Sequence, residues 1–294
     1  MKFKKLLAAV AAGLMMSSLA ACGSTSGSSP ETSADTSADT PAAAAGEDNS
    51  DKILKVGVKD AVIGFGYKDP LSGEYSGLEI ELAKKIADSL GYKDVEFTTV
   101  TAATRTELLD SGDLDCVLAT FTITDERKKS WDFSTAYYTD AVTVLVETAD
   151  GITNIDGLVG KKIGVSTGST SAYALVKAMS EKGLLGDYVI PESSADFDIS
   201  SFSEGGTSFE QFGDYPAISN AMTAGTVDAF CVDKSILATY KSDDRQYIED
   251  TFSPQEYGVA TKKDSPLSAP IDELIKTWLG DGTIDGLISE YGLN

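Results

Sequence analysis

Residues 115–127 read DCVLATFTITDER. The first six form an almost continuous apolar run of strand length, which is typical of a strand covered on both faces in a parallel sheet. Polar side chains follow where such a strand would end, and ligand sites in open α/β sheets form beyond the carboxyl ends of the strands. The segment therefore predicts a buried strand followed by a threonine-rich turn and an arginine, Arg127, at the edge of the sheet where ligand sites commonly form.

Segments of strand and helix character alternate on both sides of this strand. Leu78, Leu82, Ile86 and Leu90 recur at the spacing of one helix face. Further helices are expected at 104–110, 170–182, 216–224 and 235–241, with two more near the C-terminus. Strands are expected at 53–58, 95–100, 141–146, 162–165, 228–232 and 258–261. This alternation predicts an α/β fold with mainly parallel sheets flanked by helices.

Residues 184–213 interrupt the alternation. They are rich in Ser, Gly, Phe and acidic residues and contain no Lys or Arg. We interpret them as an acidic insertion that forms a long surface loop, and a functional lid is the alternative.

The composition excludes several classes of function. The 294 residues carry 24 Lys and Arg against 46 Asp and Glu, a net charge of −22, which repels phosphate backbones, so we expect no nucleic-acid partner. The chain has no histidine, which removes the usual base of serine and cysteine nucleophiles and the imidazole metal ligand. Three cysteines are too few and too scattered for a zinc site or a disulfide framework. We therefore expect no metal and no other cofactor.

The first fifty residues have the pattern of a targeting segment. Lys2, Lys4 and Lys5 precede an apolar run over residues 6–21 that is too short for a membrane span. The signal peptide is expected to be residues 1–21, and Leu-Ala-Ala-Cys resembles a bacterial lipobox that would make Cys22 a lipidated residue. An ordinary secretory signal is the alternative. Residues 22–50 lack aromatic residues and predict a flexible tether.

Several separated motifs resemble the bacterial extracellular solute-binding proteins for polar amino acids. They are Val56–Lys59 with Gly77–Ala83, Thr120–Arg127 with Asp132–Ser134 and Tyr137–Tyr138, Asp214–Pro216, Asp228–Lys234 and Tyr257–Gly258. The resemblance spans about residues 52–294 apart from the insertion. It is closest to the aspartate- and glutamate-binding branch that serves ABC importers.

This resemblance implies the two-lobed fold of a type II periplasmic binding protein. Lobe 1 would comprise residues 52–139 and 255–294, lobe 2 residues 140–254, with a two-strand hinge between them. It also implies a monomeric receptor without enzymatic activity, which lies outside the cytoplasm and hands its ligand to the permease subunits of an ABC transporter. Contact with the membrane would be through the lipid anchor only. Cys116 and Cys231 would lie in different lobes, where a disulfide would block hinge motion, so we expect free, buried thiols.

The resemblance further assigns contacts with the backbone of an amino-acid ligand. Arg127 would hold the α-carboxylate, for which a planar guanidinium is well suited, with Thr120 and Thr122 beside it. Asp233 would accept from the ammonium, and Thr170 would contact the carboxylate from lobe 2. Taken alone, Arg127 could equally pair with a neighbouring acid on the surface, and Asp233 could cap the helix expected after it.

The ligand's side chain is assigned through two further cations. Lys59 and Arg105 match positions that serve the side-chain carboxylate in the acidic-amino-acid branch, whereas glutamine-binding relatives commonly have an acid where Lys59 stands. Tyr215 would be a wall or a hydroxyl donor from lobe 2. Surface positions for the two cations and a capping role for Tyr215 are the alternatives.

Aspartate or glutamate is therefore the expected ligand. Another polar amino acid, glutamine or cystine, is the main alternative. A dehydratase-like enzyme and a surface adhesin on the same fold are further alternatives, because fold alone does not decide function.

Overall fold

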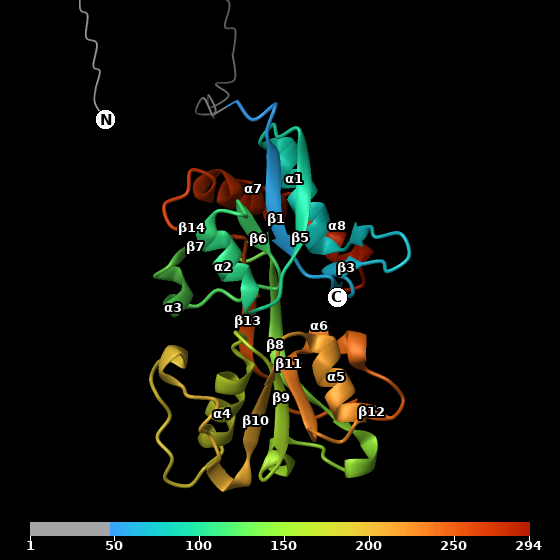
Figure 1. Cartoon of the computed structure of the whole chain (residues 1–294), viewed down its shortest axis with the longest axis vertical. Coiled ribbons are helices and arrows are strands. Elements are labelled where there is room, and N and C mark those ends of the chain that lie inside the picture. The colour runs from blue at the N-terminus through green and yellow to red at the C-terminus, as the bar shows by residue number, and fades with distance from the viewer. Residues whose placement is uncertain (1–47) are drawn as a thin grey trace, which may run out of the picture. The chain divides into compact units, whose positions relative to one another are not determined.

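The computed structural model describes residues 48–294. The predicted signal peptide, Cys22 and most of the predicted tether lie outside the described residues. Within this part of the chain, two large mixed β-sheets with helices on their faces form the architecture (Figure 1). We call the first sheet with its helices lobe 1, and the second sheet with its helices lobe 2. The predicted two-lobed α/β fold is confirmed.

The sheet of lobe 1 has five strands. Their order is β5 (Asp94–Thr99), β1 (Ile53–Val58), β6 (Cys116–Leu118), β14 (Ala260–Lys262) and β7 (Trp131–Phe133). The first three strands are parallel, with Val56 paired to both Phe97 and Cys116, and β14 is antiparallel to β6 and β7. The helices of this lobe are α1 (Leu78–Ser89), α2 (Thr104–Ser111), α3 (Asp125–Lys128), α7 (Ser268–Gly280) and α8 (Thr283–Glu290).

A small antiparallel sheet adjoins lobe 1 between β1 and α1. It consists of β2 (Ala61–Val62), β3 (Gly66–Lys68) and β4 (Tyr75–Ser76). Gly77, which follows β4, has a positive φ, and a Cβ there would lie 2.2 Å from the carbonyl oxygen of Phe65. Glycine is thus required where the chain enters α1.

The sheet of lobe 2 has six strands. Five follow the order β10 (Ser208–Phe212), β9 (Lys162–Ser166), β11 (Ala229–Asp233), β8 (Tyr138–Glu147) and β12 (Arg245–Tyr247), and β13 (Phe252–Tyr257) pairs with β8. The helices are α4 (Ser171–Glu181), α5 (Tyr215–Thr223) and α6 (Lys234–Leu237). Short 3₁₀ turns are η1 (Thr148–Asp150), η2 (Ile155–Leu158), η3 (Ser194–Asp196), η4 (Glu204–Gly206) and η5 (Ala238–Tyr240).

Three local predictions differ from the structure. The interpretation of residues 184–213 as one loop is wrong at its end, because β10 pairs in parallel with β9 as the edge strand of the sheet. The helix expected at 235–241 is α-helical only through Leu237 and continues as a 3₁₀ turn. The sheet of lobe 2 is also less parallel than expected, since β8 runs antiparallel to β11, β12 and β13.

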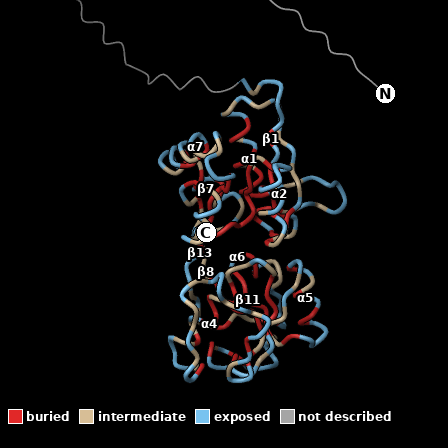
Figure 2. The backbone as a smooth tube through the Cα atoms, turned by 60° about the vertical axis from the view of Figure 1, so that its left-hand side comes forward, coloured by how far each residue is buried: buried red, intermediate tan, exposed pale blue. Residues whose placement is uncertain are grey.

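Alternating side chains of the strands supply separate apolar cores. Val142, Val144 and Val146 of β8 pack with α4 on one face of its sheet, and Leu145 packs on the opposite face with α5, as the two-residue period of a strand requires. The core on the α5 side is continuous with the core under α1, α7 and α8 of lobe 1. Figure 2 shows the buried residues concentrated around the strands of the two sheets.

Strands β8 and β13 connect the lobes. They are antiparallel partners whose pairing ends with Tyr138 opposite Tyr257, next to the points where the chain enters and leaves the sheet of lobe 1. The two rings stack with centroids 5.9 Å apart, and Phe65 meets both edge-on. The Tyr138 hydroxyl donates to the carbonyl oxygen of Leu293, 2.9 Å away. Aromatic packing therefore surrounds the two strands on which a hinge motion would depend.

Cys116 and Cys231 are buried free thiols, as predicted. Burial raises the pKa of both thiols above the ordinary value. Within residues 48–294, none of the helices has the length and apolar character that crossing a membrane requires.

Aromatic side chains anchor the segment before β10 to lobe 2. The Phe202 ring, 5% exposed, contacts Tyr188, Phe197 and Phe209 at centroid distances of 5.4, 5.7 and 5.5 Å. This packing explains why the phenylalanines in an otherwise polar and acidic segment are not surface residues.

We expect Phe202→Ala to lower the free energy of unfolding by about 3–5 kcal/mol, because it removes a buried aromatic ring and leaves a cavity. Urea denaturation followed by circular dichroism measures the effect. Val189→Ala is the control, since Val189 in the same segment is 85% exposed and its truncation should change stability by less than about 0.5 kcal/mol. Equal stability of the two variants would contradict the proposed packing.

Candidate functional site

Two adjoining pockets lie where the strand ends of lobe 1 meet lobe 2. The first we call the arginine pocket, and it is lined by Ala102, Arg105, Thr120, Thr122, Arg127, Ser169, Thr170, Ser171, Tyr215, Val232 and Asp233. The second we call the lysine pocket, and it is lined by Lys59, Asp60, Ala61, Val62, Val100, Thr101, Ala102, Ser166, Gly213, Asp214, Tyr215 and Pro216. Ala102 and Tyr215 belong to both. All eight residues expected to contact a ligand therefore line these two pockets.

The turn after β6 is held in an unusual conformation. Thr120 has a φ of +45°, which is sterically unfavourable for a residue with a Cβ and marks stored strain. Its backbone N–H donates to Oε1 of Glu79 on α1, 2.6 Å away. Its carbonyl oxygen and that of Ala119 accept from Nη1 of Arg105, at 3.3 and 2.9 Å. The buried carboxylate of Glu79 and the buried guanidinium of Arg105 therefore both hydrogen-bond to the backbone of this turn.

Arg127 is oriented by backbone contacts. Thr124 caps the short helix α3 by accepting from the Arg127 N–H. Within the guanidinium, Nη1 donates to the carbonyl oxygen of Thr122 at 2.7 Å, and Nη2 to that of Gly168 in lobe 2 at 3.2 Å. Loss of hydration lowers the pKa of Arg127 to about 9, with the nearby charge of Arg105 adding to the effect.

Arg105 differs in part from its expected role. Its side chain is buried and its guanidinium carbon lies 3.7 Å from the centroid of the Phe121 ring, which Arg127 also approaches, at 4.7 Å. Nη1 is already bonded to the backbone of the turn, so Arg105 supports the arginine pocket as well as facing it. Burial lowers its pKa to about 10.

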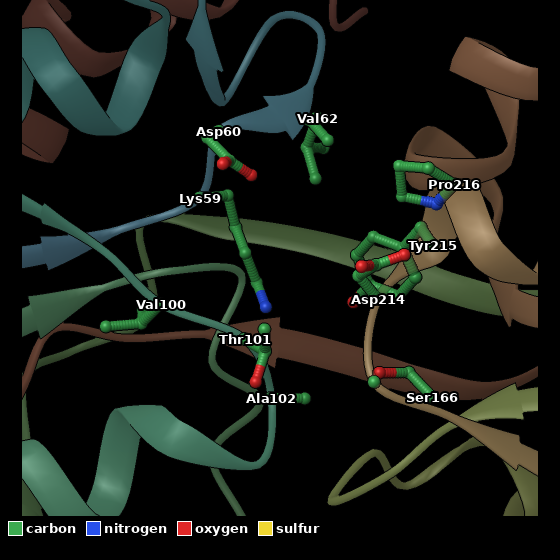
Figure 3. Close-up of a pocket in the computed structure, with 12 residues that line it drawn as sticks. Lys59, Asp60, Val62, Val100, Thr101, Ala102, Ser166, Asp214, Tyr215 and Pro216 are labelled. Carbon is green, nitrogen blue, oxygen red and sulfur yellow. The ribbon is translucent and has the colours of Figure 1, made fainter.

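Lys59 extends from the end of β1 into the lysine pocket. Figure 3 shows its ammonium between Thr101 of lobe 1 and Tyr215 of lobe 2, and Nζ lies 5.3 Å from the centroid of the Tyr215 ring. Lys59 is 4% exposed. Burial lowers its pKa to about 7; the charge of Arg105 lowers the pKa as well, and the nearby acids Glu79, Asp60 and Asp233 oppose the fall.

Asp233 lies at the end of β11 with its carboxylate in the arginine pocket. The hydroxyl of Tyr257 donates to Oδ2 at 2.5 Å. The Asp233 side chain makes no capping hydrogen bond to α6, so the helix-cap alternative is not what the structure shows. Burial raises the pKa of Asp233 to about 7, although Arg105 and Arg127 favour the carboxylate.

Contacts between the lobes show that the structure is closed. A Cβ on Gly168 would lie 2.7 Å from the carbonyl oxygen of Ala102 in lobe 1, so these backbones touch. The hydroxyls of Thr122 and Thr170, one from each lobe, both donate to Oε1 of Gln255 at 2.8 Å. The Thr170 hydroxyl is thus directed at the hinge strand β13 and not into open pocket space.

Sequence reasoning missed four residues of this region: Glu79, Phe121, Gln255 and Asp60. Glu79 could have been found, because it falls on the α1 face that carries Ala83 and Ile86 and is therefore an acid at a buried position. Asp60 follows Lys59 directly and lines the same pocket, so the pocket does contain an acid at the end of β1. Phe121 and Gln255 carry no local signal of their roles.

The charges of the site are incompletely matched. In the described part of the chain, the ion pairs involve other residues, and Lys59, Arg105 and Arg127 contact no carboxylate. Three of the four buried side-chain atoms without a hydrogen-bond partner also belong to this region of residues 48–294, namely Glu79 Oε2, Arg105 Nε and Ser171 Oγ. Of these atoms, Arg105 Nε and Ser171 Oγ can donate to the carboxylate of a guest, whereas Glu79 Oε2 is an acceptor. Among residues 48–294, no group of three or more acidic or thiol side chains is placed to hold a metal ion.

Comparisons with known proteins place this geometry in a family. The chain is 34% identical over 279 residues to the ABC transporter glutamine-binding protein GlnH of Bacillus subtilis, covering 93% of this chain and 91% of that protein. It is 27% identical to the L-cystine-binding protein TcyJ of Escherichia coli, covering 81% and 82%. An ancestral arginine-binding protein bound to arginine superposes with a TM-score of 0.67 at 29% identity, covering 82% and 99%. The profile of the bacterial extracellular solute-binding proteins, family 3, matches residues 54–294, and the chain belongs to that family.

Proposed function

We propose that the protein is the substrate-binding component of an ABC amino-acid importer, acts outside the cytoplasm, and takes an acidic amino acid, glutamate or aspartate. The relatives named above bind glutamine, cystine and arginine, so similarity supports an amino-acid ligand and favours glutamine or cystine over an acidic side chain, and the acidic ligand is argued from the cleft alone. Lipid anchoring at Cys22 and delivery to a permease are parts of the same proposal.

The observation that carries the acidic ligand is the excess of positive charge in the cleft. Lys59 and Arg105 are buried and Arg127 is half-buried. They face two buried carboxylates, Asp233 and Glu79. A dicarboxylic amino acid brings one net negative charge and neutralises this set, whereas glutamine leaves one positive charge and arginine leaves two. Because an unmatched buried charge costs several kcal/mol, the cleft favours a guest with a second carboxylate.

In the proposed complex each ligand group has a partner. The α-carboxylate lies at Arg127 with the N–H groups at the start of α4, the ammonium at Asp233, and the distal carboxylate in the lysine pocket. Asp233 is also the group that general-acid chemistry would use, since its pKa is raised to about 7. An ammonium beside it stabilises the carboxylate, which supports binding without turnover.

Glutamine is the second candidate. Asp60 lines the lysine pocket, and its carboxylate can accept from a side-chain amide. Isothermal titration of the purified protein with glutamate, aspartate, glutamine, cystine and arginine decides between them. We expect the acidic ligands to bind at least tenfold more tightly than glutamine, and the reverse order would replace the proposal by its alternative. Conversion of any of these amino acids during incubation would instead indicate an enzyme.

Arg127→Ala should weaken the binding of every amino-acid ligand by about 2–5 kcal/mol, which is about 30-fold or more, because every such ligand carries the α-carboxylate. Calorimetry measures the loss. Lys128→Ala is the matched control, since its side chain is exposed and pairs only with Asp125 on the surface. Undiminished affinity of the Arg127 variant would show that the α-carboxylate binds elsewhere.

Lys59→Gln should weaken the binding of glutamate much more than the binding of glutamine. Only glutamate has a distal carboxylate, and the substitution removes the positive charge that would pair with it. The measured quantity is the ratio of the two dissociation constants. Lys55→Gln, which removes an exposed lysine from the same strand, should leave the ratio unchanged. Equal losses of affinity for both ligands in the Lys59 variant would show that Lys59 does not determine which ligand side chain is preferred.

The affinity for glutamate is expected to be highest near pH 7 and to fall on both sides. A bound dicarboxylate raises the pKa of Lys59 above the value of about 7 in the empty cleft, so binding takes up a proton and weakens as pH rises above 7. The ligand ammonium lowers the pKa of Asp233 from about 7, so binding releases a proton and weakens as pH falls below 7. Titrations between about pH 5.5 and 8.5 measure both limbs. An affinity that is constant over this range would contradict the assignment of both groups.

A further inference from the structure

Tyr257 is a fully buried residue that no proposed ligand contact uses. It ends the hinge strand β13, at 0% exposure. Its hydroxyl donates to Oδ2 of Asp233, 2.5 Å away. Within residues 48–294, this is the only hydrogen bond of the Asp233 side chain. Asp233 is the proposed acceptor for the ligand's ammonium, so the hydroxyl occupies one carboxylate oxygen and leaves Oδ1 for the ligand.

The ring that carries this hydroxyl is held by other aromatic rings. Tyr138 stacks on it with the centroids 5.9 Å apart. The centroids of Phe65 and Tyr137 lie 5.7 and 6.5 Å from that of Tyr257. Because the hydroxyl oxygen is bonded directly to the ring, packing that fixes the ring also fixes the oxygen.

The backbone of Tyr257 is tied to the turn that orients Arg127. Tyr257 forms an antiparallel bridge with Thr122, and the Thr122 carbonyl oxygen accepts from Nη1 of Arg127 at 2.7 Å. The Tyr257 carbonyl oxygen accepts from the Tyr137 N–H at 2.9 Å. A single residue therefore links the proposed anchor of the α-carboxylate in lobe 1 to Asp233 in lobe 2.

A second carboxylate lies close to the same hydroxyl. Oδ2 of Asp140 on β8 is 3.3 Å from the Tyr257 hydroxyl oxygen. This Asp140 oxygen already accepts from the N–H of Ser235 at 3.0 Å and from the Ser235 hydroxyl. A phenol has one proton to donate, and the shorter distance assigns it to Asp233.

We propose that Tyr257 is a positioning residue of the binding site, whose hydroxyl holds the Asp233 carboxylate where it can accept from the ammonium of a ligand anchored at Arg127. The inference rests on the proposed role of Asp233, and it applies to an acidic amino acid and to glutamine alike. Tyr257 touches no ligand in this account and acts through Asp233.

Tyr257→Phe removes the hydroxyl and keeps the ring with its aromatic contacts. Asp233 then loses its hydrogen-bond donor and its fixed orientation, so the binding of an ammonium weakens. A ligand analogue without the amino group has no such interaction to lose. Glutarate is this analogue of glutamate, and glutaramate is that of glutamine. A purely structural role of Tyr257 in the hinge would weaken amino acid and analogue equally.

The experiment is isothermal titration of the full-length protein and its variants with these four compounds. For Tyr257→Phe we expect the preference for glutamate over glutarate to fall about tenfold, as for the loss of a hydrogen bond to a charged group. The preference for glutamine over glutaramate should fall likewise. Tyr138→Phe is the matched control: it removes a hydroxyl from the neighbouring ring of the same hinge, where the partner is the carbonyl oxygen of Leu293. Both preferences should then stay those of the wild type.

The pH dependence of amino-acid binding gives a second readout, which does not require the analogues to bind. The groups that act on the charge of Asp233 are Tyr257 on β13, Asp140 on β8, Arg105 on α2, Arg127 on α3, Lys59 on β1 and Tyr215 on α5. Burial raises the pKa of Asp233, and the hydrogen bond from Tyr257 opposes that rise. In Tyr257→Phe the fall in affinity at low pH should therefore move to higher pH by about one unit, which corresponds to a tenfold loss of affinity at the acidic end. Tyr138→Phe should keep the wild-type profile.

Equal losses for an amino acid and its analogue, or a fall at low pH that does not move, would overturn the inference and leave the proposed function intact. A wild-type protein that binds glutamine and no acidic amino acid would overturn the proposed ligand. In that case a lowered preference for glutamine over glutaramate in Tyr257→Phe would still support the inference, and an unchanged preference would overturn it as well.

Discussion

Three cations lose most of their hydration in the closed cleft and gain no carboxylate of the protein in contact. Removing a charge from water without pairing it costs several kcal/mol, and the lowered pKa values of Lys59, Arg105 and Arg127 express that cost. Natural proteins retain such arrangements where a ligand completes them. The cleft is therefore best understood as half of an ion-pair network, with the guest as the other half.

The rest of the fold places these charged groups close together when the lobes close. Strands β1, β6 and β11 end at the same place and deliver Lys59, the Thr120 turn and Asp233. Because the hydroxyls that meet at Gln255 come from different lobes, and because Gly168 touches Ala102 across the cleft, the set of contacts exists only in the closed arrangement. A ligand that joins both lobes shifts the population toward closure by the contacts it adds there. The net charge of −22 does not oppose an anionic guest at short range, since salt screens distant acids over about 8 Å.

The sequence predicts the parts of the molecule that depend on local pattern. The apolar run before Thr120, the amphipathic face of Leu78–Leu90 and the polar residues at strand ends are sufficient for the α/β alternation. The family motifs are sufficient to pick out eight residues that the fold places around the two pockets. What escaped prediction depends on contacts between distant segments. Glu79 meets Thr120 only after α1 packs on the first sheet, and Gln255 joins two threonines only when the lobes close. The glycine- and serine-rich surroundings of β10 carry no local strand signal, and the strand forms through its pairing with β9.

A crystal structure of the protein with glutamate bound tests the central claim most directly. The account predicts closed lobes, the α-carboxylate paired with Arg127, the ammonium at Asp233 and the distal carboxylate within hydrogen-bond distance of the Lys59 ammonium. A complex in which the distal carboxylate faces solvent, or in which Lys59 turns away from the ligand, would contradict it.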